Sequence, residues 1–409
     1  MDSLSILNYQ GSKRNLLPFI KAKLIGVISP GQTVLDIFSG TCSVGYNFKR
    51  TNRIFANDSE KYAYIISKAL LSNYSDIAAC NIISSVNFAI EENFRQAYLT
   101  YGGLANEEIA VLNNGVVSEI TDFYNSVPTV WNGKVHEVSK SQHLFLQYYP
   151  NSYFGVNQAA EIDSLRMTIE DYKNTVIFAP LMAALYYAMK ECVFSKDGHM
   201  AQPLDFDKNT SKLLKVRRKS IFDLFNVKLA EFFSPDFATS IYENECFNLN
   251  FEDLIALSKI RDEVDVIYAD PPYTDMQYSR YYHILNFVTR YKPAPLTTVR
   301  GSHTKGLYTD GRFQSKLSTR SKSLGVLAIL VDFCCTFKKS LVVSFAYPAD
   351  TFLQKTDRYV MSIEALISLC TEQFGISNVD VHSCDYTHSN NRNSEQKKVL
   401  EYLVVCKKN

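Results

Sequence analysis

The sequence has no long apolar run and no excess of charge of one sign. No stretch reaches about 18 uninterrupted apolar residues, and the N-terminal MDSLSILNYQGSKRN lacks the apolar segment of a secretion signal. We therefore expect neither a membrane-spanning nor a secreted protein. The 43 Lys and Arg residues against 42 Asp and Glu residues leave a formal net charge of +1, so a polyanion would have to meet a local basic surface.

Cysteine and histidine are present without the spacing of a disulfide framework or a metal site. The nine cysteines include no CxxC pair, and no Cys/His spacing matches a zinc site. Scattered thiols are typical of a protein from a reducing cytosol. The sequence therefore indicates a cytoplasmic protein without a bound metal.

The remaining composition is that of an ordinary globular protein, with 409 residues of which 46% are hydrophobic and 21% charged. Residues 31–70 read as an apolar strand, a Gly-containing turn, a short helix, a second strand ending in Asn-Asp and a further helix. Further strands are expected at 264–273, 340–348, 377–386 and 398–408, with a helix at 364–374. This alternation predicts an α/β fold with a mainly parallel, doubly wound sheet.

The middle of the chain has a different pattern. It contains long polar segments of helical character, a Tyr-rich stretch (FLQYYPNSYF) and a strongly apolar helix (APLMAALYYAM). We expect a mainly helical domain, residues 76–240, inserted in an α/β domain made of residues 1–75 and 241–409. The insertion ends near the basic run KNTSKLLKVRRKS, which is either a solvated face or a surface for phosphate groups.

A carboxylate and a glycine-containing turn follow the first strand of the sheet. Asp36 and Gly40 lie in the turn, and Asp58 comes at the end of the next strand. Open α/β sheets bind nucleotides at the carboxyl ends of their strands, and a carboxylate there can accept hydrogen bonds from two ribose hydroxyls. The structural alternative is a turn glycine and an Asp that caps a helix.

The sequence Asp270-Pro271-Pro272-Tyr273 follows the apolar strand VDVIYA. Two prolines form a stiff bend, so the Asp270 carboxylate and the Pro271 carbonyl become a rigid pair of acceptors. Such a pair can hold an exocyclic amino group, which donates two hydrogens. Tyr273 then offers a flat face on which the same planar base can stack. An Asp before a turn is common for structural reasons alone, but the nucleotide-type unit upstream favours a site.

The order NYQGSK, DIFSGTCSVG, ND and ADPPY resembles the Dam-like N6-adenine DNA methyltransferases, with a target-recognition insertion ahead of the DPPY motif. The resemblance implies a Class I methyltransferase (Rossmann-like) fold that uses S-adenosylmethionine as cofactor. It implies that the cofactor-binding residues are Tyr9, Lys13, Asp36, Phe38, Gly40, Asp58 and Asp270. It further implies that the catalytic residues are Asp270, Pro271, Pro272 and Tyr273.

Two positions depart from the pattern of that family. Cys42 occupies the place of the usual second glycine of the turn, and Cys246 is nearest to the place where an acidic residue is expected, around 244–247. Neither change removes an acceptor that methyl transfer needs.

The resemblance implies methyl transfer to the N6 atom of a flipped-out adenine in double-stranded DNA, in a restriction-modification or self-protection system of a prokaryotic or phage-infected cell. A cognate restriction endonuclease would then be a partner. The alternatives are methylation of cytosine N4, which uses the same chemistry, and a non-catalytic DNA-binding regulator with the same fold. The candidate DNA contacts are Lys212, Lys215, Arg217, Arg218 and Lys219 in the basic run and Arg300, His303 and Lys305 in the loop RGSHTKG.

Overall fold

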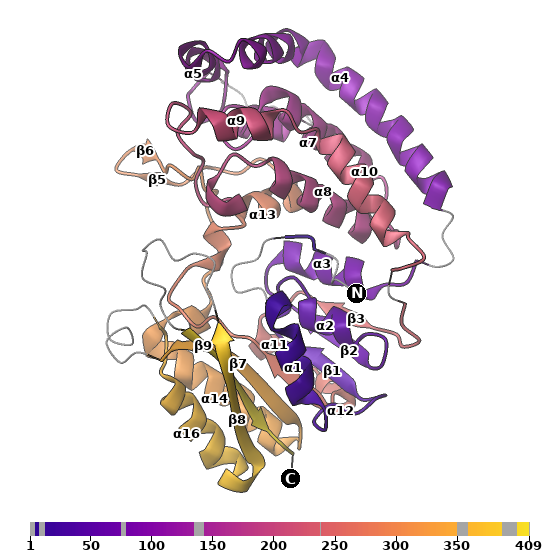
Figure 1. Cartoon of the computed structure of the whole chain (residues 1–409), viewed down its shortest axis with the longest axis vertical. Helices are drawn as coiled ribbons and strands as arrows, with labels where there is room; N and C mark the ends of the chain where they lie inside the picture. The colour runs from indigo at the N-terminus through magenta and orange to yellow at the C-terminus, as the bar shows by residue number, and fades with distance from the viewer. Residues whose placement is uncertain are drawn as a thin grey trace.

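The computed structural model describes residues 5–7, 13–74, 79–134, 143–237, 239–349, 359–386 and 399–408. The predicted cofactor residue Tyr9 lies outside these ranges. Figure 1 shows two lobes, one built around a sheet and one built of helices. We call them the sheet lobe, made of the described residues within 13–74, 233–280 and 313–408, and the helical lobe, made of the described residues within 79–232 and 281–312.

A seven-stranded sheet forms the sheet lobe, and its strand order is β3-β2-β1-β4-β7-β9-β8. The strands are β1 (Thr33–Asp36), β2 (Arg53–Asn57), β3 (Glu245–Phe247), β4 (Val266–Ala269), β7 (Ser340–Pro348), β8 (Val379–Tyr386) and β9 (Val399–Cys406). The pairs β3-β2, β2-β1, β1-β4 and β4-β7 are parallel, while β9 runs antiparallel to both β7 and β8. The predicted α/β fold with a mainly parallel sheet is confirmed.

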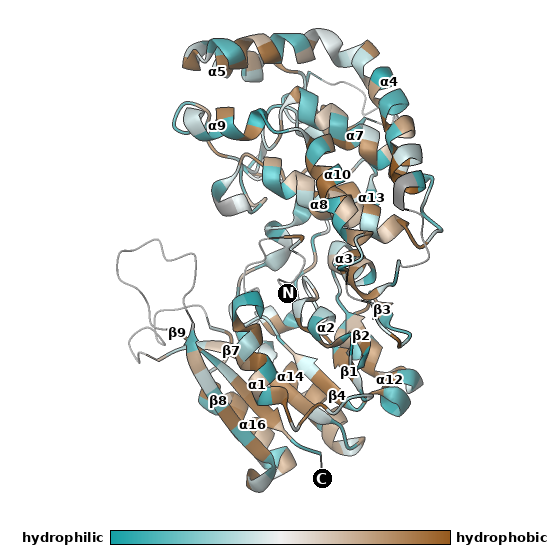
Figure 2. Cartoon of the chain, turned by 45° about the vertical axis from the view of Figure 1, so that its right-hand side comes forward, coloured by the Kyte–Doolittle hydropathy of each residue, from teal (hydrophilic) through white to brown (hydrophobic). Residues whose placement is uncertain are grey.

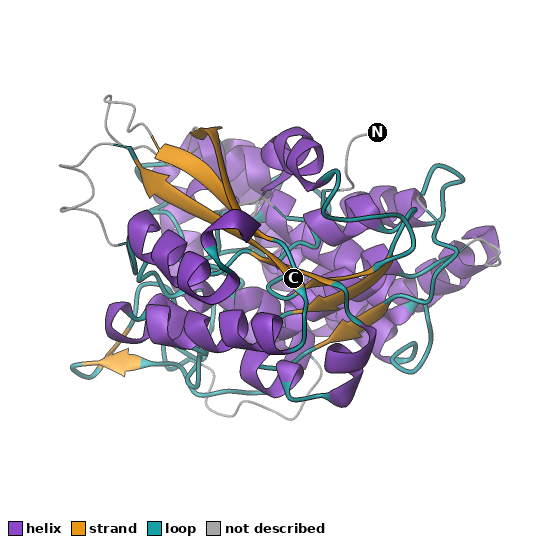
Figure 3. Cartoon of the chain, turned by 90° about the horizontal axis from the view of Figure 1, so that it is seen from below, coloured by secondary structure: helices purple, strands orange, loops and turns teal. Residues whose placement is uncertain are grey.

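Helices cover both faces of the sheet, as Figure 3 shows from below. One set comprises α1 (Leu17–Leu24), α2 (Ser43–Phe48) and α3 (Lys61–Leu71), and the other α11 (Phe251–Ile255), α12 (Ser258–Glu263), α14 (Arg320–Thr336) and α16 (Ile363–Phe374). Successive strand residues belong to different apolar clusters, with Val34 in one and Leu35 in the other. Such a strand is buried on both faces, which explains its uninterrupted apolar sequence.

The helical lobe contains the predicted inserted helices and one more from beyond the insertion. They are α4 (Ala79–Asn114), α5 (Val117–Ser126), α6 (Leu144–Tyr148), α7 (Val156–Glu170), α8 (Phe178–Cys192), α9 (Thr210–Arg217), α10 (Ile221–Phe232) and α13 (His283–Arg290). The apolar residues of α8 and α10 lie at its centre (Figure 2). Arg166 of α7 donates from Nε to the Val288 carbonyl of α13 at 2.9 Å, so the chain returns to this lobe after β4.

The two lobes share one apolar core. A single cluster of buried side chains extends from Val34 and Val266 in the sheet to Leu181 in α8 and Leu285 in α13. A short hairpin, β5 (Thr298–Val299) with β6 (Ser302–His303), projects from the helical lobe on its outer side (Figure 1). None of the described helices is both long enough and apolar enough to cross a bilayer.

Candidate active site

Three acidic residues meet at one edge of the sheet because their strands are parallel neighbours. Asp36 ends β1, Asp58 follows β2, and Asp270 follows β4. In the strand register Asp36 lies beside Ala56 of β2 and Tyr268 of β4. The carboxyl ends of adjacent parallel strands are the usual place for a ligand in an open α/β sheet.

The backbone of the first turn fixes two of these carboxylates. The Gly40 amide donates to Asp58 Oδ2 at 2.9 Å, and the Gly45 amide donates to Asp36 Oδ2 at 3.3 Å. Gly40 and Cys42 both have positive φ, 50° and 55°. For Cys42 this left-handed conformation costs about 1–2 kcal/mol relative to the right-handed one, which explains why a glycine suits this position. The turn keeps its shape with cysteine there.

Burial sets the protonation of both carboxyl groups. Burial raises the pKa of Asp36 to about 7, assisted by the nearby Asp270 and Asp58 and opposed by the hydrogen bond from Gly45. Burial also raises the pKa of Asp58 to about 6, against the hydrogen bonds from the Glu60 and Gly40 amides. A cationic or hydroxyl-bearing ligand would stabilise the ionised form of each group.

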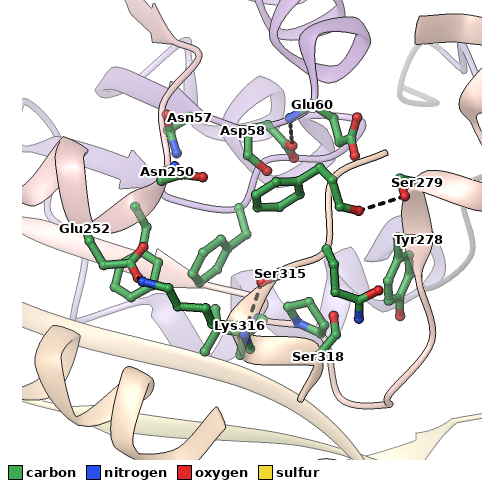
Figure 4. A pocket seen from close by; sticks show the side chains of 18 of the residues that line it. Asn57, Asp58, Glu60, Asn250, Glu252, Tyr278, Ser279, Ser315, Lys316 and Ser318 are labelled. Atoms are coloured by element: carbon green, nitrogen blue, oxygen red, sulfur yellow. Dashed lines mark hydrogen bonds and ion pairs between the residues drawn. The ribbon is translucent and has the colours of Figure 1, made fainter. Parts of the chain in front are cut away.

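Two adjoining cavities open at this edge, and Phe38 and Asp270 line both of them. The larger has a volume of about 270 Å³, and the smaller, of about 30 Å³, lies against Lys13, Asp36 and the glycine-containing turn. Figure 4 shows Asn57, Asp58 and Asn250 on one side of the larger cavity and Ser315 and Lys316 on another.

The larger cavity has the chemical character of a nucleoside site. Asp58 supplies a carboxylate that could accept hydrogen bonds from ribose hydroxyls, and the rings of Phe38 and Phe251, 5.7 Å apart and inclined at 73°, form an aromatic wall. Asn250 adds an amide that can pair with the edge of a base. Sequence reasoning missed Asn250 and looked instead at Cys246, which lies within β3, opposite Ala56.

Asp270 and Tyr273 of the Pro-Pro bend both line the larger cavity. Asp270 Oδ1 lies 3.0 Å from Lys13 Nζ, and its side chain is 21% exposed. Lys13 Nζ also lies 5.7 Å from the centre of the Tyr273 ring. The structure therefore brings together Lys13, Asp36, Phe38, Gly40, Asp58 and the DPPY residues, all of them predicted site residues.

Two acidic residues near the cavity were missed from the sequence. Glu60 lines the larger cavity and accepts a hydrogen bond from Asn286 Nδ2 of α13. Burial raises the pKa of Glu60 to about 7. Glu401, on β9, lies 2.9 Å from Lys13 Nζ. No sequence signal marks Glu401, since 388 positions separate it from Lys13.

The basic run of α9 is only partly available to a ligand. Lys215 and Arg218 are exposed, but Lys212 Nζ donates to the Ser195 carbonyl and Lys219 Nζ pairs with Glu191 at 3.1 Å. Arg217 is 7% exposed. Its guanidinium donates hydrogen bonds to Tyr124, Ser152, Tyr153 and Gln158 inside the lobe, which argues against the predicted direct contact with DNA.

The second predicted basic segment lies near the first. Arg300 and His303 are exposed in the β5-β6 hairpin, and Arg300 takes a left-handed turn conformation with φ of 52°. Lys305 Nζ pairs with Asp205 Oδ1 at 2.9 Å, which ties this loop to the segment that precedes α9. The pair is exposed, so Lys305 remains accessible to solvent.

A basic cleft between the lobes was not predicted. It has a volume of about 960 Å³ and is lined by α3, by the end of α7 and by the end of α13. Its exposed cations include Lys61, Lys68, Arg290 and Lys292. These residues come from distant parts of the chain, so they form no charge run in the sequence. Within the described ranges, no three His, Cys, Asp or Glu side chains gather as metal ligands.

Comparisons with known proteins are consistent with this geometry. A sequence model of the D12 class N6 adenine-specific DNA methyltransferases matches residues 9–304. Modification methylase LlaI of Lactococcus lactis subsp. lactis is 23% identical over 417 residues, covering 98% of this chain and 55% of that protein. Type II methyltransferase M.FokI of Planomicrobium okeanokoites is 27% identical over 296 residues, covering 70% of this chain and 37% of that protein.

A relative of similar length also matches. Type II methyltransferase M.NlaIII of Neisseria lactamica is 22% identical over 421 residues, covering 98% of this chain and 99% of that protein. The chain thus spans about half or less of the length of LlaI and M.FokI, and nearly all of M.NlaIII.

Proposed function

Because the chain belongs to the D12 class N6 adenine-specific DNA methyltransferase family, we propose that it transfers a methyl group from S-adenosylmethionine to the N6 atom of an adenine in double-stranded DNA. The observation that supports this most directly is the position of Asp270, which lines both cavities at the edge of the sheet. A carboxylate placed there can contact the amino group of a base while the methyl donor occupies the neighbouring space.

The residues around the cavities fit the parts of S-adenosylmethionine. Asp58 holds the ribose, Phe38 and Phe251 enclose the adenine ring, and Asp36 with the Gly40 turn faces the charged methionine end. Tyr9 and Lys13 complete this site by resemblance to the family. When bound, the cofactor supplies a methyl group on a sulfonium centre, which is reactive without an acid or a nucleophilic side chain from the protein.

The DPPY residues prepare the target nitrogen. The N6 lone pair of adenine is delocalised into the ring, so N6 is a poor nucleophile. Asp270 and the Pro271 carbonyl accept hydrogen bonds from the amino group and favour a more tetrahedral nitrogen, whose lone pair is available. Pro272 keeps the bend rigid, and Tyr273 provides a face for the base after it leaves the helix.

The helical lobe is the proposed target-recognition region. The DNA backbone contacts Lys215, Arg218, Arg300, His303 and Lys305, all exposed, with half-buried Lys212 and Lys219 at the margin. The exposed cations of the cleft between the lobes, Lys61, Lys68, Arg290 and Lys292, extend this surface toward the catalytic edge. Relatives named modification methylase or type II methyltransferase suggest a role in restriction-modification, in the cytoplasm of a prokaryotic or phage-infected cell and with a restriction endonuclease as partner.

The test is transfer of labelled methyl from S-adenosylmethionine to unmethylated genomic DNA, followed by nucleoside digestion and chromatography. We expect the label in N6-methyladenine. Label in N4-methylcytosine would contradict the proposed base and keep the mechanism. Cofactor and DNA binding without any labelled nucleoside would contradict the enzyme and favour the non-catalytic regulator.

A further inference from the structure

Lys13 lies between two carboxylates behind the DPPY bend. Its Nζ is 3.0 Å from Asp270 Oδ1 and 2.9 Å from Glu401 Oε1. Lys13 is 4% exposed and Glu401 is fully buried. Glu401 Oε1 also accepts a hydrogen bond from Ser344 Oγ of β7. The proposed chemistry uses Asp270 and Lys13 but gives Glu401 no role.

Burial of the Glu401 carboxylate is unfavourable for the stability of the folded protein. It stands on β9, opposite Ala346 of β7, in a strand whose other residues are largely apolar. Its second oxygen, Oε2, has no hydrogen-bond partner among the described residues. A buried carboxylate with an unsatisfied oxygen is less favourable than an apolar side chain of similar size. Its presence in this strand therefore calls for a reason other than stability.

We propose that Glu401 is a positioning residue for methyl transfer, which holds the Lys13 ammonium against one oxygen of Asp270 and keeps the other oxygen free for the target amino group. This inference rests on the proposed function. In the reaction the N6–methyl bond forms, the sulfur–methyl bond of the donor breaks with its electron pair left on sulfur, and N6 loses one proton to Asp270. The Lys13 ammonium is shared between Asp270 and Glu401, so it neutralises Asp270 only in part. Asp270 therefore stays basic enough to accept that proton.

The charges that face Asp270 support this role. Lys13 approaches from the 3-10 helix Lys13–Leu16, Glu401 from β9, Tyr268 from β4, Asp36 from β1 and Tyr278 from the 3-10 helix Tyr278–Arg280. Burial raises the pKa of Asp270 well above its usual range; Lys13 opposes this shift and Glu401 adds to it. Loss of the Glu401 charge should therefore lower the pKa of Asp270.

Burial alone would lower the pKa of Lys13, but Asp270 and Glu401 together hold it well above its usual value. The ammonium thus stays charged throughout the working pH range. Lys13 can therefore hold Asp270 in place as a fixed positive charge.

The variant Glu401→Gln keeps the size of the side chain and removes the charge. We expect single-turnover methyl transfer to unmethylated DNA to slow by roughly 10- to 100-fold at neutral pH, the cost of misplacing a catalytic group. The KM values for S-adenosylmethionine and DNA should stay near those of the natural protein. The acid limb of the pH–rate profile should move to lower pH. Unchanged rate and profile with a lower Tm would overturn the proposal.

Two further variants separate positioning from stability. Glu401→Asp keeps the negative charge, but its shorter side chain places the carboxylate farther from Lys13. The acid limb of the pH–rate profile should therefore stay in place while the rate of methyl transfer falls. Should Glu401→Gln fail to fold, a normal single-turnover rate for folded Glu401→Asp would overturn the proposal. Glu108→Gln in the helical lobe is the matched control, because Glu108 is also buried but accepts hydrogen bonds only from its own lobe; it should lower Tm without moving the acid limb.

A measurement without turnover distinguishes this inference from the proposed function. Titration of the ¹³C-labelled carboxyl of Asp270 by NMR, assigned with Asp270→Asn, should give a lower midpoint in Glu401→Gln than in the natural protein. An equal or higher midpoint would overturn the role of Glu401 whether or not the protein methylates DNA. Absence of methyl transfer by the natural protein would instead overturn the proposed function.

Discussion

Both lobes bury charged side chains, but the two lobes differ in how fully the fold satisfies two of these side chains, Arg217 and Glu401. In the helical lobe, the Arg217 guanidinium makes four hydrogen bonds to acceptors of its own lobe. In the sheet lobe, Asp36 and Asp270 line cavities, and Glu401 has an oxygen without a partner among the described residues. Buried charge by itself therefore does not mark a functional site. A functional site is better indicated by a buried acidic side chain that has an oxygen without a hydrogen-bond partner in the protein.

The largest effect should come from the sheet lobe. We expect Asp270→Ala to lower the rate of methyl transfer by roughly 10²- to 10³-fold or more, the range seen when a group that stabilises a transition state is removed. Its cofactor binding, measured by calorimetry, should change little. Substantial methyl transfer by Asp270→Ala would contradict the catalytic role of Asp270 in the sheet lobe.

The corresponding test in the helical lobe is Arg217→Met, which should affect stability and not activity. It leaves the Ser152 and Tyr153 carbonyls and Gln158 Oε1 without this donor, so we expect a loss of at least about 2 kcal/mol in the free energy of unfolding. The salt dependence of DNA binding, measured below the Tm of the variant, should not change. A flatter salt dependence would restore Arg217 as a DNA contact.

The pH dependence of cofactor binding tests whether the sheet-lobe acids face a ligand. Their pKa values are raised in the free protein, to about 7 for Asp36 and about 6 for Asp58, and a cationic, hydroxyl-bearing ligand prefers both ionised. Binding should therefore release protons and strengthen as pH rises from 5.5 to 8, by roughly tenfold or more, with a plateau above the free-protein pKa. Calorimetry at several pH values measures this. Asp36→Asn should flatten the profile, and an unaltered profile would move the cation contact away from Asp36.

The smallest effect concerns the exposed cations of α9. Replacing Lys215 and Arg218 together by Ala should reduce the slope of log binding constant against log salt concentration by about 1.8, if each meets one phosphate. The matched double variant of Lys212 and Lys219, whose ammonium groups are hydrogen-bonded within the lobe, should reduce it less. Equal slopes for the two double variants would show that hydrogen bonding inside the lobe does not decide which cations reach DNA.

Local patterns predicted most of the sheet lobe correctly. The unit at 31–70 appears as β1, α2, β2 and α3, and the four later strands lie within or close to their predicted ranges. These signals are short-range, since a strand buried on both faces needs a continuous apolar run and its end needs a turn. The DPPY motif could be placed because its residues are adjacent in the chain.

The missed features depend on contacts between distant segments. Glu401 reaches Lys13 only because β9 pairs with β7, and no spacing in the sequence reports that pairing. Arg217 stands in a run of exposed cations, but the helix α9 turns it inward toward Tyr124 and Phe194. Charge runs record composition, whereas burial depends on which face of a helix meets the core.

The position of β9 between β7 and β8 has a consequence for synthesis of the protein. Until β9 leaves the ribosome, β7 and β8 have unpaired edges, and Lys13 has no second carboxylate to hold it. Entry of β9 then closes both edges and completes the charged trio in a single event. A nascent chain would thus acquire its active centre only once β9 has been synthesised, after the helical lobe has had time to fold.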